Sequence, residues 1–148
     1  MTKITNDKHL AFTQFSDEID AYFRQRFSYK SRCAFARHPT VDVKRAAVRL
    51  YLRFRVGDSW PVGSIVIAVI EFRTQRRGQG RALLCKLVEM SSTYGYQTIE
   101  VEQTGLDASI QAFVRKFGFT NSFDERNWIV SVNQLRDLLA SLPLRPAG

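Results

Sequence analysis

The chain has 148 residues, of which 45% are hydrophobic and 12% are aromatic, and its formal net charge at pH 7 is +8. This length and composition fit one globular domain with its own hydrophobic core and exclude a disordered tail. The longest apolar run is far below the roughly 20 residues that cross a bilayer, and the first residues lack the apolar stretch of a signal peptide. We therefore predict a single domain over residues 1–148, no membrane association and a cytoplasmic location.

The few cysteines and histidines predict neither a disulfide nor a metal site. Cys33 and Cys85 are expected to be free thiols, because a chain without a secretion signal stays in a reducing compartment. The two histidines, His9 and His38, are isolated in sequence and do not make a zinc site, so we expect no metal.

The positive charge lies in the first half of the chain. Residues 1–77 hold 15 Lys and Arg against 7 Asp and Glu, whereas residues 78–148 hold 7 of each kind. This excess favours either solubility alone or an anionic partner bound by the N-terminal half.

The first predicted element is a helix over residues 13–27, whose apolar side chains recur at helical spacing. Thr13 or Ser16 is placed to cap its beginning, because a hydroxyl oxygen accepts a hydrogen bond from a first-turn amide. The helix would turn these side chains to the core: Phe15, Ile19, Tyr22, Phe23 and Phe27. The next segment, residues 33–46, fits either a short strand or a loop.

Two strands follow. Residues 47–56 alternate strictly, with Arg49, Tyr51, Arg53 and Arg55 on the face opposite the aliphatic residues. Residues 62–72 are apolar on both faces, which indicates a central strand. Since a cluster of turn residues lies between them, the two strands predict a hairpin.

Helices and strands alternate in the rest of the chain. A helix after a glycine-rich turn ends at Gly95, and a strand follows over residues 98–103. A further helix ends at Gly118 in a Schellman-type cap, a strand covers residues 128–132, and a short helix covers residues 133–141. This order predicts an α+β or mixed α/β layered domain.

The turn before the first of these helices contains two glycines and four arginines within the sequence RTQRRGQGRA, residues 73–82. The free amides of a first helical turn, together with the helix dipole, form a site for an anion such as a diphosphate. Gly78 and Gly80 allow close approach because they carry no Cβ. The Walker and dinucleotide-binding patterns are absent, which disfavours a P-loop enzyme and a Rossmann fold.

This turn resembles the coenzyme-binding motif [QR]-x-x-G-x-[GA] of the GNAT superfamily of acyl-CoA-dependent N-acyltransferases. The motif fits in two registers, residues 75–80 and residues 77–82, which use the same amides. The resemblance covers residues 47–132 and implies a GNAT-like α/β (α+β) fold. In that fold a mixed, mostly antiparallel central sheet is flanked by helices and splayed at the strand before the glycine turn.

Residues 107–119, DASIQAFVRKFGF, are similar to the second motif of the same family. The residues that match are Phe113, Lys116, Gly118 and Phe119. Asp107 replaces the usual asparagine, and Val114 replaces the tyrosine that the family often uses to protonate the departing thiolate. Ser109 or Tyr96 is a candidate to replace that acid.

The resemblance implies transfer of an acetyl group from acetyl-CoA to a primary amine by direct transfer in a ternary complex. It divides the chain into an acceptor-side helical region (1–46), a CoA-binding core (47–132) and a C-terminal helix and tail (133–148). The residues implied to bind the coenzyme are Phe72, Arg73, Gln75, Arg76, Arg77, Gly78, Gln79, Gly80, Arg81, Ala82 and Phe113.

Acyl transfer needs a base, because the acceptor amine must lose its proton. Glu102, Glu100 and Glu71 are the candidate bases, in that order, since they lie on or at the end of the strands beside the expected splay. The alternative for each is a solvated carboxylate or one that pairs with an arginine.

The partner expected from the sequence is an amine acceptor that is anionic or borne by a nucleic acid. Basic and aromatic residues alternate over residues 22–32 and on the arginine face of strand 47–56. The pattern fits either aromatics in the core with solvated arginines, or contacts to a phosphate backbone and stacked bases. The alternatives are an acceptor without nucleic acid, a tRNA- or DNA-modifying enzyme on the same fold, and a non-catalytic binding protein. Residues 128–142 are the segment through which a homodimer is predicted.

Overall fold

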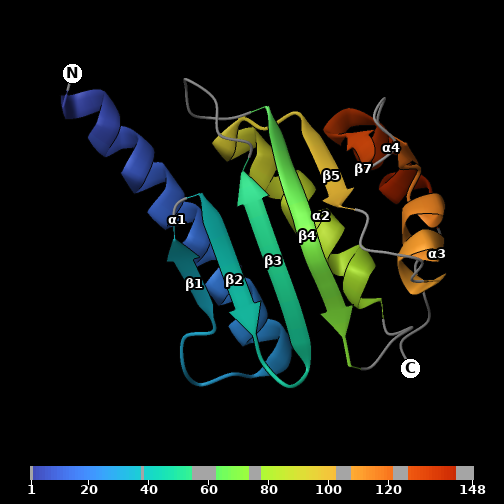
Figure 1. The fold of residues 1–148 in the computed structure, drawn as a ribbon, viewed down its shortest axis with the longest axis horizontal. Helices are drawn as coiled ribbons and strands as arrows, with labels where there is room; N and C mark the ends of the chain where they lie inside the picture. The colour runs from blue at the N-terminus through green and yellow to red at the C-terminus, as the bar shows by residue number, and fades with distance from the viewer. Residues whose placement is uncertain are drawn as a thin grey trace.

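The computed structural model describes residues 2–37, 39–54, 63–73, 78–102, 108–121 and 127–142, with the backbone alone for residues 2–10. These residues form four helices and one seven-stranded sheet in the order β1-β2-β3-β4-β5-β7-β6 (Figure 1). The helices are α1 (Thr2–Phe27), α2 (Gln79–Tyr94), α3 (Ala108–Lys116) and α4 (Val132–Ser141). The strands are β1 (Ala34–Arg37), β2 (Thr40–Lys44), β3 (Val48–Phe54), β4 (Ser64–Phe72), β5 (Thr98–Glu102), β6 (Thr120–Asn121) and β7 (Asn127–Ser131).

The sheet is antiparallel except between β4 and β5, which run parallel. Their pairing begins at Ser64 opposite Thr98 and stops at Ile67 opposite Val101, although β4 continues to Phe72. The two strands therefore separate over the second half of β4. The predicted fold class, a mixed and mostly antiparallel sheet splayed at the strand before the glycine turn, is confirmed.

A β-bulge lies in β4 where this separation begins. Leu52 of β3 is opposite Ile67, but Tyr51 is opposite Val69, so Ala68 has no partner on β3. One extra residue in a strand disrupts the hydrogen-bond ladder locally and bends the strand. The bulge thus coincides with the point where the backbone of β4 loses its partner on β5.

One hydrophobic core fills the space between the helices and one face of the sheet. Phe15, Ile19 and Phe23 of α1 are fully buried in it, as their spacing predicted. In Figure 1, α1 and α2 both lie behind the sheet, and the ring of Phe15 contacts Tyr94 of α2 edge-on at 5.2 Å. The opposite face of β2, β3 and β4 is covered by no helix among the described residues.

The beginning of α1 differs from the prediction. The helix begins at Thr2, so Thr13 and Ser16 lie in its interior and cap nothing. Ser16 is buried and accepts a hydrogen bond from Arg32 at 3.1 Å. The polar first turns carry little apolar periodicity, which is why the sequence pattern placed the start too late.

Most other predicted elements are present. Residues 33–46, left open between strand and loop, form β1 and β2, and the two-residue strand β6 was not predicted. Gly118 ends α3 with a left-handed φ of 77°. Its amide donates to Arg115 and the amide of Phe119 donates to Val114, which is the predicted Schellman arrangement. The turn predicted between β3 and β4 lies outside the described residues.

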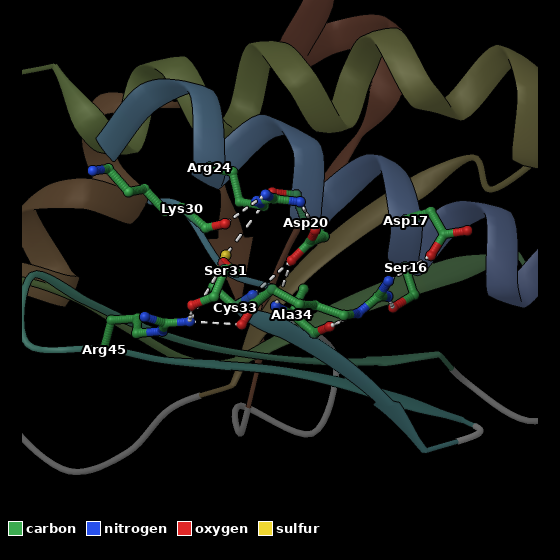
Figure 2. Close-up of polar contacts among 10 residues, drawn as sticks. Ser16, Asp17, Asp20, Arg24, Lys30, Ser31, Cys33, Ala34 and Arg45 are labelled. Carbon is green, nitrogen blue, oxygen red and sulfur yellow. Dashed lines mark hydrogen bonds and ion pairs between the residues drawn. The ribbon is translucent and has the colours of Figure 1, made fainter. Parts of the chain in front are cut away.

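The basic segment after α1 is held by a buried carboxylate (Figure 2). Asp20, 5% exposed, accepts hydrogen bonds from the backbone amides of Cys33 at 2.7 Å and Ala34 at 3.0 Å. Burial alone would raise the pKa of Asp20, but the bonds from Ala34 and Cys33 and the charge of Arg32 outweigh it, so the pKa lies below its ordinary value. The carboxylate is therefore a fixed anchor for β1.

Two arginines from outside this segment, one in α1 and one after β2, bind its backbone carbonyls. Arg24 donates to the carbonyl of Lys30 at 2.8 Å, and Arg45 donates to that of Arg32 at 2.6 Å (Figure 2). Arg45 also lies over the ring of Tyr29. The prediction that the basic residues of 22–32 form a rim for an anion therefore needs revision, because several of them hold the chain itself.

Both cysteines are free thiols, as predicted. Cys33 is buried, whereas Cys85 is exposed. Burial, followed by the nearby charge of Asp20, raises the pKa of Cys33 to about 11. Among the described helices, none is both long and apolar enough to cross a membrane.

Candidate functional site

The glycine turn joins the end of β4 to the beginning of α2. The amide of Arg73 donates to Ala47 at 3.0 Å and fixes the end of the strand. Gly78 stands at the N-cap of α2 with a φ of 73°, a left-handed conformation that a glycine adopts without strain. Among the described residues no side chain caps this helix, unlike α4, where Ser131 accepts from the amide of Gln134 at 3.0 Å.

The first turn of α2 presents amides that the helix itself does not use. The first helical hydrogen bond runs from the amide of Ala82 to the carbonyl of Gly78 at 2.9 Å. The amide of Ala82, implied above to hold the coenzyme, is therefore engaged within the helix. The amides of Gln79, Gly80 and Arg81 precede it and have no intrahelical acceptor by helix geometry. With the positive end of the helix dipole, they fit a diphosphate.

The second glycine is required by a neighbouring ring. A Cβ added to Gly80 would lie 2.6 Å from Cε2 of Phe113, which no carbon–carbon contact tolerates. Phe113 is half-buried and its ring also contacts Phe117 at 5.1 Å between centroids. The structure thus places Phe113, the one predicted coenzyme residue distant in sequence, beside the glycine turn.

Positive charge reaches this turn from α1 as well. Nε of Arg26, in the last turn of α1, donates to the side-chain carbonyl of Gln79. Arg26 was not among the predicted site residues, although the alternation of arginines over residues 22–32 was noted. Close to it, burial raises the pKa of the Tyr22 hydroxyl to about 12, with Arg26 acting in the opposite direction.

The side chain of Arg81, a residue expected to bind the coenzyme, contacts the end of α4 instead. Its Nη2 donates to the carbonyls of Leu139 at 3.3 Å and Leu142 at 3.1 Å, at the end of α4. This side chain therefore ties the beginning of α2 to the C-terminal helix. Gln75, Arg76 and Arg77 lie outside the described residues. Phe72 is half-buried against the core and Arg73 is exposed.

Glu102 lies where β4 and β5 separate. It follows Val101, the last residue of β5 that pairs with β4, and its side chain is 33% exposed. Nη2 of Arg53 contacts its Oε1 at 3.0 Å. Arg53 comes from β3, so the ion pair crosses the outer face of β4. A partly accessible carboxylate at this place fits the predicted base.

Glu100 occupies a more enclosed position on the same face. It is 3% exposed, and its two oxygens accept hydrogen bonds from Ser64 at 2.5 Å and from Asn127 at 3.2 Å. These partners tie β5 to β4 and β7, which suits a structural role. Glu71 is exposed near the end of β4, and Arg49 stands directly opposite it on β3.

The candidate replacements for the missing tyrosine differ in accessibility. Val114 is fully buried. Tyr96 is 3% exposed, and its hydroxyl donates to the carbonyl of Leu87. Burial, followed by the nearby charge of Glu18, raises the pKa of this hydroxyl. This hydroxyl is enclosed in the core, and the suggestion that Tyr96 supplies the acid is wrong. Ser109 is exposed on α3.

The described residues bring together no group of three or more side chains suited to hold a metal. The residues that the sequence reasoning missed are Arg26, Arg53, Ser64 and Asn127. Each acts on a predicted residue from another element, and no local pattern indicates such a pairing. The alternation of strand 47–56 gave the face of Arg53 but not its partner.

The comparisons with known proteins address the fold. No protein-family model matches the chain, and no curated protein matches its sequence. A GCN5-related N-acetyltransferase from Brucella melitensis matches with a TM-score of 0.50 and 19% identity, over 68% of this chain and 53% of that chain. A chain of the AtaT–AtaR complex bound to DNA matches with a TM-score of 0.50 and 15% identity, over 68% of this chain and 73% of that one. The protein therefore has the GNAT fold.

Proposed function

We propose that the protein is an N-acyltransferase that transfers an acetyl group from acetyl-CoA to a primary amine by direct transfer in a ternary complex. The observation that carries this proposal is the uncapped, glycine-led beginning of α2, placed directly after the strand that splays away from β5. The fold of solved acetyltransferases supports it.

The residues of the turn fit the coenzyme. The amides of Gln79, Gly80 and Arg81 would hold its diphosphate, and Phe113 would form part of the wall beside them. Gly80 has no room for a side chain, as expected where the backbone must come close to a neighbour. Acetyl-CoA supplies the acetyl group as a thioester, and positioning it beside an amine accounts for up to roughly 7–11 kcal/mol of the barrier in favourable cases.

The groups that we propose for the chemistry lie where β4 and β5 separate. Glu102 would take the proton of the acceptor amine, directly or through a water, and the ion pair with Arg53 would orient its carboxylate. The backbone amide at the Ala68 bulge is the donor that we propose for the carbonyl oxygen as negative charge develops. Glu100 would keep β5 in place.

Binding of acetyl-CoA tests the proposal directly. Calorimetry should show saturable binding to the wild-type protein, and mass spectrometry should detect CoA that copurifies with it. Release of free thiol from acetyl-CoA in the presence of a panel of amines tests turnover. A protein that neither binds acetyl-CoA nor releases thiol with any amine contradicts the proposal.

The base is tested by two matched variants. Glu102→Gln removes the charge and should lower kcat about 10²–10⁴-fold, the usual effect of losing a general base. Glu100→Gln keeps an acceptor oxygen for Ser64 and should lower stability more than it lowers kcat. Full activity in Glu102→Gln would contradict the assignment of the base.

A second candidate is a coenzyme-binding protein without transferase activity. Burial of Val114, where the family often has its acidic tyrosine, favours this reading. It predicts acetyl-CoA binding without thiol release for any amine. The two candidates therefore share the binding experiment and separate in the turnover experiment.

A further inference from the structure

A cavity of about 450 Å³ lies where the end of β2, the beginning of β3 and the end of β4 meet, and the turn that joins β2 to β3 lines it as well. Its charged lining consists of four cations, Lys44, Arg45, Arg49 and Arg73, and one carboxylate, Glu71. Residues from two turns and three strands thus place several positive charges around one cavity. Such a cluster is unfavourable unless something balances it, because the cations repel one another.

The protein itself balances little of this charge. Nε of Arg49 is buried and has no hydrogen-bond partner. Within the described residues, the side chains of Lys44 and Arg73 take part in no hydrogen bond or ion pair. Glu71 stands opposite Arg49 on the neighbouring strand but forms no ion pair with it in the part of the chain that the structure describes. A buried, unsatisfied guanidinium nitrogen costs stability.

Arg45 is held in place. Its Nη2 donates to the carbonyl of Arg32 at 2.6 Å and to the hydroxyl of Ser31 at 3.2 Å (Figure 2). Its guanidinium also lies 4.9 Å from the centroid of Tyr29. The cavity therefore has one immobilised arginine in its wall, and the other cations have donors left for a ligand.

The side chain of Arg49 points away from the sheet face that α2 covers. Val48 and Leu50 point to the core, where α2 lies, so Arg49 between them points to the opposite face. Lys44 is paired with Arg49 across β2 and β3 and shares that face. Arg53 and Glu102, which we assign to the acceptor side, lie further along the same face.

We propose that this cavity binds a phosphate group of the acceptor. Arginine and lysine donors match the oxygens of a phosphate in charge and geometry, and a phosphate would satisfy the orphan Nε of Arg49. The inference rests on the proposed function, which it deepens: the acceptor is an amine that also carries a phosphate, anchored here while its amine reaches Glu102.

The first experiment measures the site without any turnover. Inorganic phosphate is titrated into the wild-type protein and followed by phosphorus NMR, with chloride used to keep the ionic strength constant. We expect Arg49→Gln to bind phosphate at least tenfold more weakly, and Lys44→Gln to bind it more weakly as well. Arg37→Gln is the matched control, because Arg37 is an exposed cation at the edge of the sheet, outside the cavity. Equal phosphate affinity in Arg49→Gln and wild type overturns the proposal, and so does an equal loss in Arg37→Gln.

The second experiment tests whether the phosphate that binds in the cavity is part of the acceptor or part of the coenzyme. Acetyl-CoA and its 3′-dephospho form are compared by calorimetry on the wild-type protein and on Arg49→Gln. If the cavity serves the acceptor, the ratio of the two affinities is the same in both proteins. If Arg49→Gln no longer distinguishes the two coenzymes, the phosphate belongs to the coenzyme and the acceptor assignment is wrong. Absence of acetyl-CoA binding, with phosphate binding still dependent on Arg49, would overturn the proposed function and leave the phosphate site standing.

Discussion

The segment around Asp20 and the beginning of α2 are both rich in arginine, but they differ in how their backbone amides are satisfied. Around Asp20, arginines donate to carbonyls and carboxylates of the chain itself, as with Arg24 on Lys30 and Arg45 on Arg32. At the beginning of α2, the helix has no capping side chain, and its first amides have no acceptor within the helix. In the first region the polar groups bind one another, and we call it the closed network. In the second, the first amides of α2 have no acceptor within the helix, and we call it the open network.

This difference shows that net charge does not locate a ligand. Much of the positive excess lies in the N-terminal half, but part of it holds β1 against α1. The places suited to an anion are the first turn of α2, whose amides have no acceptor within the helix, and the cavity around Arg49, whose Nε has no hydrogen-bond partner among the described residues. Changes in the closed network should lower stability, whereas changes in the open one should lower ligand affinity.

The largest expected effect is that of Asp20→Ala. The substitution leaves the amides of Cys33 and Ala34 buried without an acceptor, which costs about 3 kcal/mol in the free energy of unfolding. Urea denaturation measures this loss. Asp17→Ala is the control: Asp17 contacts Arg32 at 2.9 Å on the surface, and its loss should cost about 0–1 kcal/mol. If the two variants are equally stable, the closed network does not hold this region.

The next effect is that of Gly80→Ala on acetyl-CoA. The new Cβ would meet Phe113 at 2.6 Å, so either the ring or the first turn of α2 must move. We expect about tenfold weaker binding, which corresponds to about 1.4 kcal/mol. Gly63→Ala serves as the control, because nothing lies within 4 Å of its added Cβ. Unchanged affinity in Gly80→Ala would show that the turn tolerates displacement.

A smaller effect concerns the dependence of stability on pH. The folded-state pKa of Asp20 lies below its ordinary value of 3.8, so its contribution is complete above that value and is lost as the pH falls through the folded pKa. Asp20→Asn keeps an acceptor oxygen but cannot titrate. Its free energy of unfolding should therefore fall less steeply below about pH 4 than that of the wild type. If urea denaturation gives the same dependence of the free energy of unfolding on pH below about pH 4 for both proteins, Asp20 does not contribute to the loss of stability in acid.

The smallest effect is on thiol reactivity, which should leave stability and affinity unchanged. At pH 8, Cys85 is exposed and should react with a disulfide reagent, whereas burial raises the pKa of Cys33 to about 11 and protects it. A thiol assay should count one cysteine in the native protein and two in urea. Cys85→Ser should abolish the native signal. Two reactive thiols in the native state would mean that β1 opens from α1 easily.

The local elements were accessible from the sequence because their signals are local. Periodicity gave the buried stripe of α1, alternation gave the two faces of β3, and glycines gave the ends of α2 and α3. The start of α1 was missed since its first turns are polar, and β6 was missed because two residues carry no pattern.

The sequence by itself determined the glycine turn, the strand before it and the helix after it, because backbone freedom and hydrophobic periodicity are written in adjacent residues. Tertiary structure alone decided which charges are engaged. Arg81 binds the end of α4, Arg53 reaches Glu102, and Arg49 lies unpartnered in its cavity. Arg53 and Glu102 are 49 positions apart, and Arg81 and Leu139 are 58 apart. Whether such side chains meet depends on strand register and helix packing, which fix distances in space that spacing along the chain does not contain.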